Sequence, residues 1–388
     1  MRADLRLVAA PGPAEPRDRS ARLPQARGPL GEAVLEALRA SRDGNLDSLA
    51  RRAAALAHGA AQRWQVLDGE TATAVLDDDD LHLALVVLQE LHYRGYDGVD
   101  DRVEWHPQLV GARTALEGVQ ESALRVLTGP TVEASLRRIR ARAGSTPSAQ
   151  DVAAELFDLV DADTSPSVSA HLDHLRDHGQ LARRVPEFLV HRSIYQLKEA
   201  DPHSWAIPRL AGRAKAALVE VQSDEYGGGL PERMHSALFA QVMRDLGLDD
   251  HYGRYVDAVP AATLASVASL SMFGLHRRLR GAVAGHLAVF EMTSSIPHRR
   301  YGNALRRLGA PDSALVFFDE HVEADAVHEQ IAARDLAGGL VEDEPQRLTD
   351  VLFGAAACLL LDGRWAEHVL EAWGRGRSSL RLPLRRDW

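Results

Sequence analysis

Residues 317–338, FFDEHVEADAVHEQIAARDLAG, carry the pattern from which we interpret the whole chain. Neither Gly nor Pro interrupts the part from His321 to His328, so it predicts a helix. At about 100° per residue, Asp325 lies about 40° around that helix from His321, and His328 lies about 20° short of two full turns. Two imidazoles and a carboxylate therefore share one stripe, which is half of a metal site suited to iron, zinc or manganese. The alternative is a solvated acidic face with two ordinary histidines.

The composition limits the classes of protein that this chain can be. Its 388 residues allow two or three domains, and the apolar residues (45%) are dominated by Ala and Leu with only 5% aromatics, which favours helix bundles. A net charge of −10 without a basic stripe argues against nucleic-acid binding. The single cysteine, Cys358, excludes intramolecular disulfides and thiolate clusters and indicates a reducing cytoplasm. No apolar run reaches about 18 residues, so we expect no membrane span.

The chain divides into four predicted segments. Residues 1–28 are rich in Pro, Arg and Ala and predict a disordered arm, and residues 29–165 predict an N-terminal helical region. Residues 166–378 predict the main bundle and residues 379–388 a tail. No segment has a convincing strand period, so the predicted fold class is all-α. One long helix is expected over about 108–128 and a short one after Pro130.

A run of four aspartates, Asp77–Asp80, resembles a metal site at first sight. It precedes an apolar helical stretch, and aspartates at that position cap a helix and complement its dipole. We therefore interpret the run as a helix start.

Further candidate ligands stand near the ends of predicted helices. Glu199 is in the last turn of a helix that stops before Pro202, and Glu225 is in the final turn before three glycines. His235 lies near the start of a helix opened by Pro231. Glu291 has apolar neighbours, where an unpaired carboxylate is expensive to bury unless a cation binds it. The candidate metal ligands are Glu199, Glu225, His235, Glu291, His321, Asp325 and His328.

The pattern Glu225-Tyr-Gly-Gly-Gly, Met234-His235, Glu291 and His321-x3-Asp325-x2-His328 resembles the heme-oxygenase-like diiron oxidases, a family of iron-containing redox enzymes. The resemblance covers about residues 30–375. It implies a heme-oxygenase-like seven-helix bundle with an N-terminal helical extension, in which these side chains bind two iron ions in place of heme.

The additional Glu199 and the ten-residue gap from Glu225 to His235 are more particular. They are similar to the N-oxygenases of nitrosourea (streptozotocin) and 2-nitroimidazole (azomycin) biosynthesis. The former kind carries a C-terminal cupin, whose His-x-His strand pattern this sequence lacks, so we expect no cupin-dependent chemistry.

The resemblance implies a non-heme diiron N-oxygenase that uses dioxygen and an external electron donor, either a reductase or a chemical reductant. Its substrate would be a small guanidine, aminoimidazole or amine of specialised metabolism, oxidised to an N-hydroxy or nitro product. A homodimer formed through the N-terminal helices is also implied. Tyr226 and His298 are candidates for groups beside the ligands.

Two other functions stay open. The same scaffold supports oxidative C–C cleavage or desaturation of a small acid or amino acid, with Arg299 or Arg306 binding the carboxylate. The second alternative is a non-catalytic helical or heme-handling protein. The acid-rich ligand set disfavours it, because heme binding of this kind needs a proximal His and few carboxylates.

Overall fold

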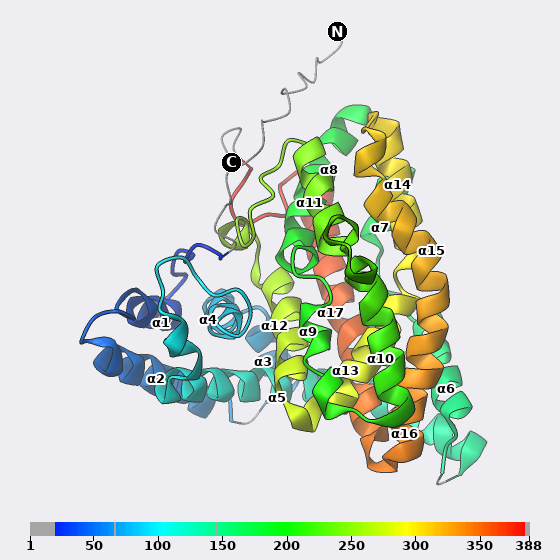
Figure 1. The fold of residues 1–388 in the computed structure, drawn as a ribbon, viewed down its shortest axis with the longest axis horizontal. Coiled ribbons are helices and arrows are strands. Elements are labelled where there is room, and N and C mark those ends of the chain that lie inside the picture. The colour runs from blue at the N-terminus through cyan, green and yellow to red at the C-terminus, as the bar shows by residue number, and fades with distance from the viewer. Residues whose placement is uncertain (1–19, 66, 145, 385–388) are drawn as a thin grey trace.

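The computed structural model describes residues 20–65, 67–144 and 146–384, and the regular secondary structure in these ranges is helical (Figure 1). Strand-like pairing within them is limited to an isolated bridge between Ala21 and Tyr96. The all-α prediction is confirmed. No helix in the described ranges combines the length and the apolar character needed to cross a bilayer.

The N-terminal region wraps around one side and the base of the bundle. Helices α1–α4 lie together at one side, α5 runs from them along α17, and α6 packs on the segment that follows α15 (Figure 1). This region therefore shares its core with the bundle. Its helices are α1 (Pro29–Arg39), α2 (Leu46–Arg63), α3 (Gly69–Leu76), α4 (Asp79–Glu90), α5 (Pro107–Ala143) and α6 (Ala149–Asp161).

Helix α5 differs from its prediction, because it continues through Pro130 instead of ending near residue 128. Thr128 and Val132, on both sides of the proline, are buried, as is Ile139 about two turns after Val132. Burial along the whole length outweighs the hydrogen bond that proline removes. The start of α4 is as expected: the Asp78 carboxylate accepts from the backbone N–H groups of Asp80 and Leu81.

Of the segment predicted to be a disordered arm, the structure describes residues 20–28, while residues 1–19 lie outside the described ranges. The Arg27 guanidinium donates to the Asp79 carboxylate at 2.9 Å and to the backbone carbonyl of Val259 at 2.8 Å. Backbone bonds from Ala21 to Gly95 and Asp97 hold the same segment further toward its start.

The bundle contains the predicted metal ligands. Its central contact is between α13 and α17, where two glycines allow the backbones to touch: a Cβ on Gly285 would lie 1.9 Å from the Val351 carbonyl oxygen, and one on Gly354 would lie 2.0 Å from that of Ala282. The bundle elements are α7 (Val168–His174), α8 (His178–Gln196), α9 (Asp201–Ser204), α10 (Gly212–Glu225), α11 (His235–Asp245), α12 (Ala261–Leu275), α13 (Arg280–Met292), α14 (Ser295–Leu308), α15 (Val316–Gln330), α16 (Gly339–Asp343) and α17 (Leu348–Gly374).

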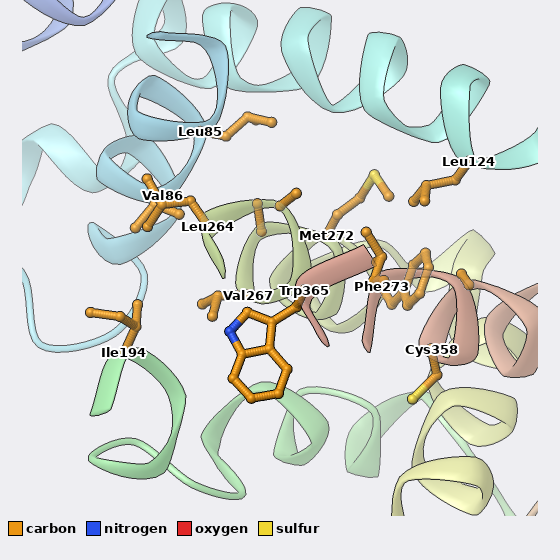
Figure 2. Packing of buried hydrophobic residues seen from close by; sticks show 14 of the residues in the cluster. Leu85, Val86, Leu124, Ile194, Leu264, Val267, Met272, Phe273, Cys358 and Trp365 are labelled. Atoms are coloured by element: carbon orange, nitrogen blue, oxygen red, sulfur yellow. The ribbon is translucent and has the colours of Figure 1, made fainter. Parts of the chain in front are cut away.

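One continuous apolar core joins the two regions. Figure 2 shows side chains of α4 (Leu85, Val86), α12 (Leu264, Val267) and α17 (Trp365) meeting within it. Cys358 is also buried there. The helix predicted over residues 317–338 is confirmed as α15 and a π-helical continuation, Ile331–Gly338, which packs against α10 and α13.

Candidate metal centre

Helix α15 presents His321, Asp325 and His328 to the interior, and all three are buried. The Nδ1–H of His321 donates to the backbone carbonyl of Phe317 at 2.7 Å, since a carbonyl can only accept. That bond fixes the tautomer and leaves Nε2 facing a Glu199 carboxylate oxygen at 3.6 Å. A metal-binding histidine usually donates one ring N–H to a carbonyl or carboxylate and keeps the other nitrogen for the metal, and the bond to Phe317 leaves Nε2 of His321 free for that role.

His328 repeats this arrangement with the opposite ring nitrogen. Its Nε2 lies 3.0 Å from the Asp224 carboxylate, and its Nδ1 lies 3.6 Å from Glu291 Oε2. Asp224 was not predicted as a site residue. Its position directly before Glu225 is the only hint that the sequence offered.

A glycine turn brings Glu225 and His235 together. Glu225 is the last residue of α10 and His235 the first of α11. Gly227 has φ +65°, and a Cβ there would lie 2.6 Å from the backbone carbon of Arg233, so only glycine allows the chain to fold back this tightly. As a result the Glu225 Oε2 and His235 Nδ1 atoms lie 2.9 Å apart.

Glu199 reaches the centre from a turn that follows α8, three residues beyond the helix end. Ala200 has φ +75°, a strained value for a residue with a side chain. Two long side chains hold this turn: Gln222 donates to the Ala200 carbonyl at 2.8 Å, and Arg94 donates to the Leu197 carbonyl at 3.0 Å. Glu199 was predicted to lie within a helical turn, and the structure places it in this strained loop.

All seven predicted ligands converge on one buried region. Glu199, Glu225, His235 and His321 each offer one ligand atom within 4.8 Å of the others, and Glu225, Glu291 and His328 form a second such group. Glu225 belongs to both. Asp325 is in neither group, but it lines the same small cavity as Glu199, Glu225, Glu291 and His321.

The electrostatics of the region show that it is poorly balanced without a cation. Burial raises the pKa of Asp325 well above its usual range, and the nearby carboxylates of Glu291, Glu225 and Glu199 raise it further. Burial opposes the charged form of His235, but the carboxylates around it, Glu225 first, raise its pKa to about 9. In the metal-free protein, protons on Asp325 and His235 therefore offset the negative charge of the surrounding carboxylates, as a bound cation would.

Buried ligand atoms without hydrogen-bond partners also indicate a metal site. Four buried ligand atoms lack a hydrogen-bond partner in the described part of the chain: Glu199 Oε2, His235 Nδ1, Asp325 Oδ2 and His328 Nδ1. His235 Nδ1 lies close to Glu225 but not in hydrogen-bond geometry. Two cis ligands on metal bonds of about 2.1 Å are separated by about 3 Å, so the 2.9 Å between these two atoms suits a shared ion. The mixed imidazole and carboxylate set suits iron, zinc or manganese.

The other predicted residues have different roles. His298 stacks on His321 with ring centroids 4.2 Å apart, so it does lie beside the candidate ligands. Tyr226 points elsewhere and donates to the Asp201 carboxylate at 2.8 Å. Arg299 is exposed, and Arg306 pairs with Asp319 at the surface, so neither faces the site as the carboxylate-binding role would require.

The fold and the site agree with a comparison to known families. Residues 186–363 match the family described as iron-containing redox enzyme, which is heme-oxygenase-like and all-α, and every candidate ligand falls within this match. Over this part of its length, the chain is similar to that family of iron-containing oxidoreductases.

The chain is also similar to one characterised enzyme. The nitrosourea synthase of Streptomyces achromogenes subsp. streptozoticus is 27% identical over 194 residues, which cover 46% of this chain and 41% of the relative. The chain thus matches less than half of that relative's length.

Proposed function

We propose that the protein is a non-heme diiron N-oxygenase that uses dioxygen to oxidise a nitrogen of a small guanidine, aminoimidazole or amine. The observation that carries the proposal is the pair of buried ligand groups that share Glu225. A carboxylate common to two groups can bridge two metal ions, and helix bundles hold carboxylate-bridged iron pairs in this way. The name of the similar nitrosourea synthase says that it forms a nitrosourea, a product with an oxidised nitrogen. This similarity supports nitrogen as the atom that is oxidised.

The candidate ligands divide between two metal positions. Glu199, His235 and His321 would hold one ion, Glu291, Asp325 and His328 the other, and Glu225 would lie between them. When bound, two irons supply Lewis acidity and the electrons for dioxygen reduction, and an external reductase or chemical reductant would restore them.

The surrounding chain performs the remaining tasks. Phe317 and Asp224 hold the outer nitrogens of His321 and His328, so both rings keep one orientation. Tyr195 and Phe290 line the small cavity between the ligands and exclude water from it. An unprotonated substrate nitrogen would approach the metal ions past Tyr195 and Phe290.

A second candidate, oxidative C–C cleavage or desaturation of a small acid or amino acid, is favoured by one observation. Arg192, which we did not predict as a site residue, lines a cavity beside the metal centre. An arginine there could bind the carboxylate of such a substrate. The identity of the product separates the two reactions, because only N-oxygenation conserves the carbon skeleton and adds oxygen to nitrogen.

The test of the proposal is anaerobic loading with Fe(II) followed by mixing with oxygen in stopped flow, with and without candidate amines. We expect a transient visible absorption band in the parental protein. Asp325→Ala and His328→Ala should abolish the band while the far-UV circular dichroism stays helical. Substrate oxidation at the parental rate in both variants would contradict the ligand assignment.

A further inference from the structure

A larger cavity, with a volume of about 230 Å³, adjoins the candidate metal centre. Tyr195 and Phe290 line both this cavity and the small one between the candidate ligands, so the two spaces are neighbours. The loop that joins α6 to α7, residues 162–167, also contributes to the wall of the larger cavity. The cavity therefore extends from the metal centre to a segment outside the regular helices.

The exposure of the lining residues locates the mouth of this cavity. Asp163, Ser165, Pro166 and Asp362 are exposed, whereas the other residues that line the cavity are buried or half-buried. The first three belong to the 162–167 loop, and Asp362 belongs to α17. The cavity therefore meets solvent between this loop and α17.

Gly363 forms a seat for the loop on α17. A Cβ on Gly363 would lie 2.7 Å from the Ser165 hydroxyl oxygen and 3.1 Å from the Ser165 Cβ, so Ser165 rests where a larger residue would exclude it. The Asp163 carboxylate accepts from the Ser165 hydroxyl at 2.7 Å and from the Ser165 backbone N–H at 3.1 Å. Asp163 and Ser165 are therefore held together as one unit against the seat.

The hydrogen bonds of the 162–167 loop are all local in the described part of the chain. Ala162 and Asp163 donate backbone N–H groups to carbonyls of α6, and Ser165 bonds to Asp163. Ser167 accepts from the backbone N–H of Ala170 in α7 at 3.2 Å. Packing alone, without a hydrogen bond, therefore holds the loop on α17, and such contacts are individually weak.

Both flanks of the loop are anchored to the bundle. At the start of α6 the backbone N–H of Ala149 donates to the Glu342 carboxylate at 2.7 Å, and in α7 the Leu172 carbonyl accepts from the Arg307 guanidinium at 2.6 Å. A short segment with fixed ends and no hydrogen bond to its seat can open locally while the rest of the fold stays intact.

We propose that the 162–167 loop is the gate of the larger cavity. Seated on Gly363, it obstructs the mouth beside Asp362, and when Ser165 leaves this seat a small molecule can enter or leave. The inference goes beyond the proposed function and does not require that iron binds.

Cys358, the single cysteine of the chain, reports on this gate. It lines the cavity one helical turn from Asp362 and is only 7% exposed. Burial raises the pKa of its thiol well above the usual range, and the Asp362 carboxylate raises it further, so the thiol should react slowly while the gate is closed. The rate of labelling by the small reagent methyl methanethiosulfonate, measured by mass spectrometry, therefore follows entry into the cavity.

One substitution should hold the gate open. Gly363→Ala places a methyl group against Ser165, whose Cβ at 3.1 Å can move away only if the loop shifts. We expect Cys358 to be labelled about 10- to 100-fold faster than in the parental protein, the effect of overpacking the closed state. Gly374→Ala is the matched control in the same helix, because nothing lies within 4 Å of its added Cβ, and it should label at the parental rate.

A disulfide should hold the gate closed. The Ser165 Cβ and a Cβ on Gly363 would lie 3.1 Å apart, within about 0.5 Å of the separation in a disulfide, so Ser165→Cys together with Gly363→Cys can be oxidised to a bond across the mouth. Cys358 is then the only free thiol. We expect oxidation of this double variant to slow Cys358 labelling by about 10-fold or more, and reduction to restore it.

Urea separates opening of the gate from unfolding of the whole protein. Labelling through the gate should change little at low urea concentrations, whereas labelling through global unfolding rises with the full slope of the unfolding transition. Equal rates in Gly363→Ala and Gly374→Ala, no slowing by the disulfide, or a full unfolding slope in the parental protein would overturn the gate. The rates are measured before and after Fe(II) loading under nitrogen, so failure to bind iron would end the diiron proposal and leave the gate standing.

Discussion

Glu90 and Lys198 form a buried ion pair of 3.0 Å between α4 and the turn that presents Glu199 to the metal centre. The Tyr252 hydroxyl also donates to Glu90, at 2.6 Å, so the carboxylate is held from two sides. Lys198 directly precedes Glu199 in the sequence, and the strained Ala200 directly follows it. The N-terminal region therefore supports a candidate ligand of the bundle.

The first prediction concerns that ion pair. Glu90→Gln leaves the buried Lys198 ammonium without a counter-charge, which we expect to destabilise the fold by about 3 kcal/mol. It should also loosen the turn and weaken Fe(II) binding, measured by titration well below the unfolding temperature. Glu36→Gln, which breaks the exposed pair with Arg52 in the same region, should change neither quantity. Parental iron affinity in folded Glu90→Gln would show that the pair does not position Glu199.

The second prediction concerns the excess of buried carboxylates. The pKa of Asp325 is raised in the folded state, so this group destabilises metal-free protein increasingly as the pH rises above its unfolded pKa of about 3.9. Asp325→Asn removes the ionisable group and should stabilise metal-free protein by about 1–3 kcal/mol at pH 7.5, while the stabilisation by Fe(II) is largely lost. Thermal unfolding with and without Fe(II) measures both. A metal-free variant less stable than the parent would contradict the electrostatic account.

The third prediction concerns the glycine turn. Gly227→Ala would place a Cβ 2.6 Å from the Arg233 backbone, so the turn must open and separate Glu225 from His235. We expect weaker iron binding together with a loss of stability. Gly228→Ala is the matched control: φ is +60° there, but nothing lies within 4 Å of the added Cβ. It should cost only about 1 kcal/mol and leave iron binding intact. Equal iron affinities in the two variants would contradict the role of Gly227.

The fourth prediction concerns acid stability. Burial lowers the pKa of His82 to about 4 and that of His191 to about 3. The unfolded chain takes up these protons below about pH 6.5 and the folded chain does not, so stability should fall as the pH drops from 6.5 toward 4. Each histidine contributes about 1.4 kcal/mol per pH unit. Urea unfolding of metal-free protein at several pH values should give a smaller slope for His191→Gln, and an unchanged slope would contradict the prediction.

Local patterns predicted those ligands whose positions depend on neighbouring sequence. The 3.6-residue period placed His321, Asp325 and His328 on one stripe, and they do share one buried face. The three glycines after Glu225 predicted the end of its helix, and α10 does end at Glu225. The helical class followed from composition and from the lack of a strand period.

Long-range packing accounts for what the sequence did not predict. Arg192 was missed because Trp365 and Asp362, which fix its guanidinium, are more than 160 residues away. Arg306 was considered for the same role from its position near the ligands, yet Asp319 holds it at the surface. We predicted disorder for residues 20–28 because the partners of Arg27 are distant in the sequence, in α4 and in the loop before α12.

The central claim is that Glu225 is shared by two metal positions, and one measurement tests it most directly. Anaerobic Fe(II) titration, with bound iron determined by metal analysis, should give about two iron ions per chain in the parental protein. Glu225→Ala should lose both, whereas His235→Ala should retain the ion beside Glu291 and His328. A single iron per chain in the parent, or two in Glu225→Ala, would contradict the account.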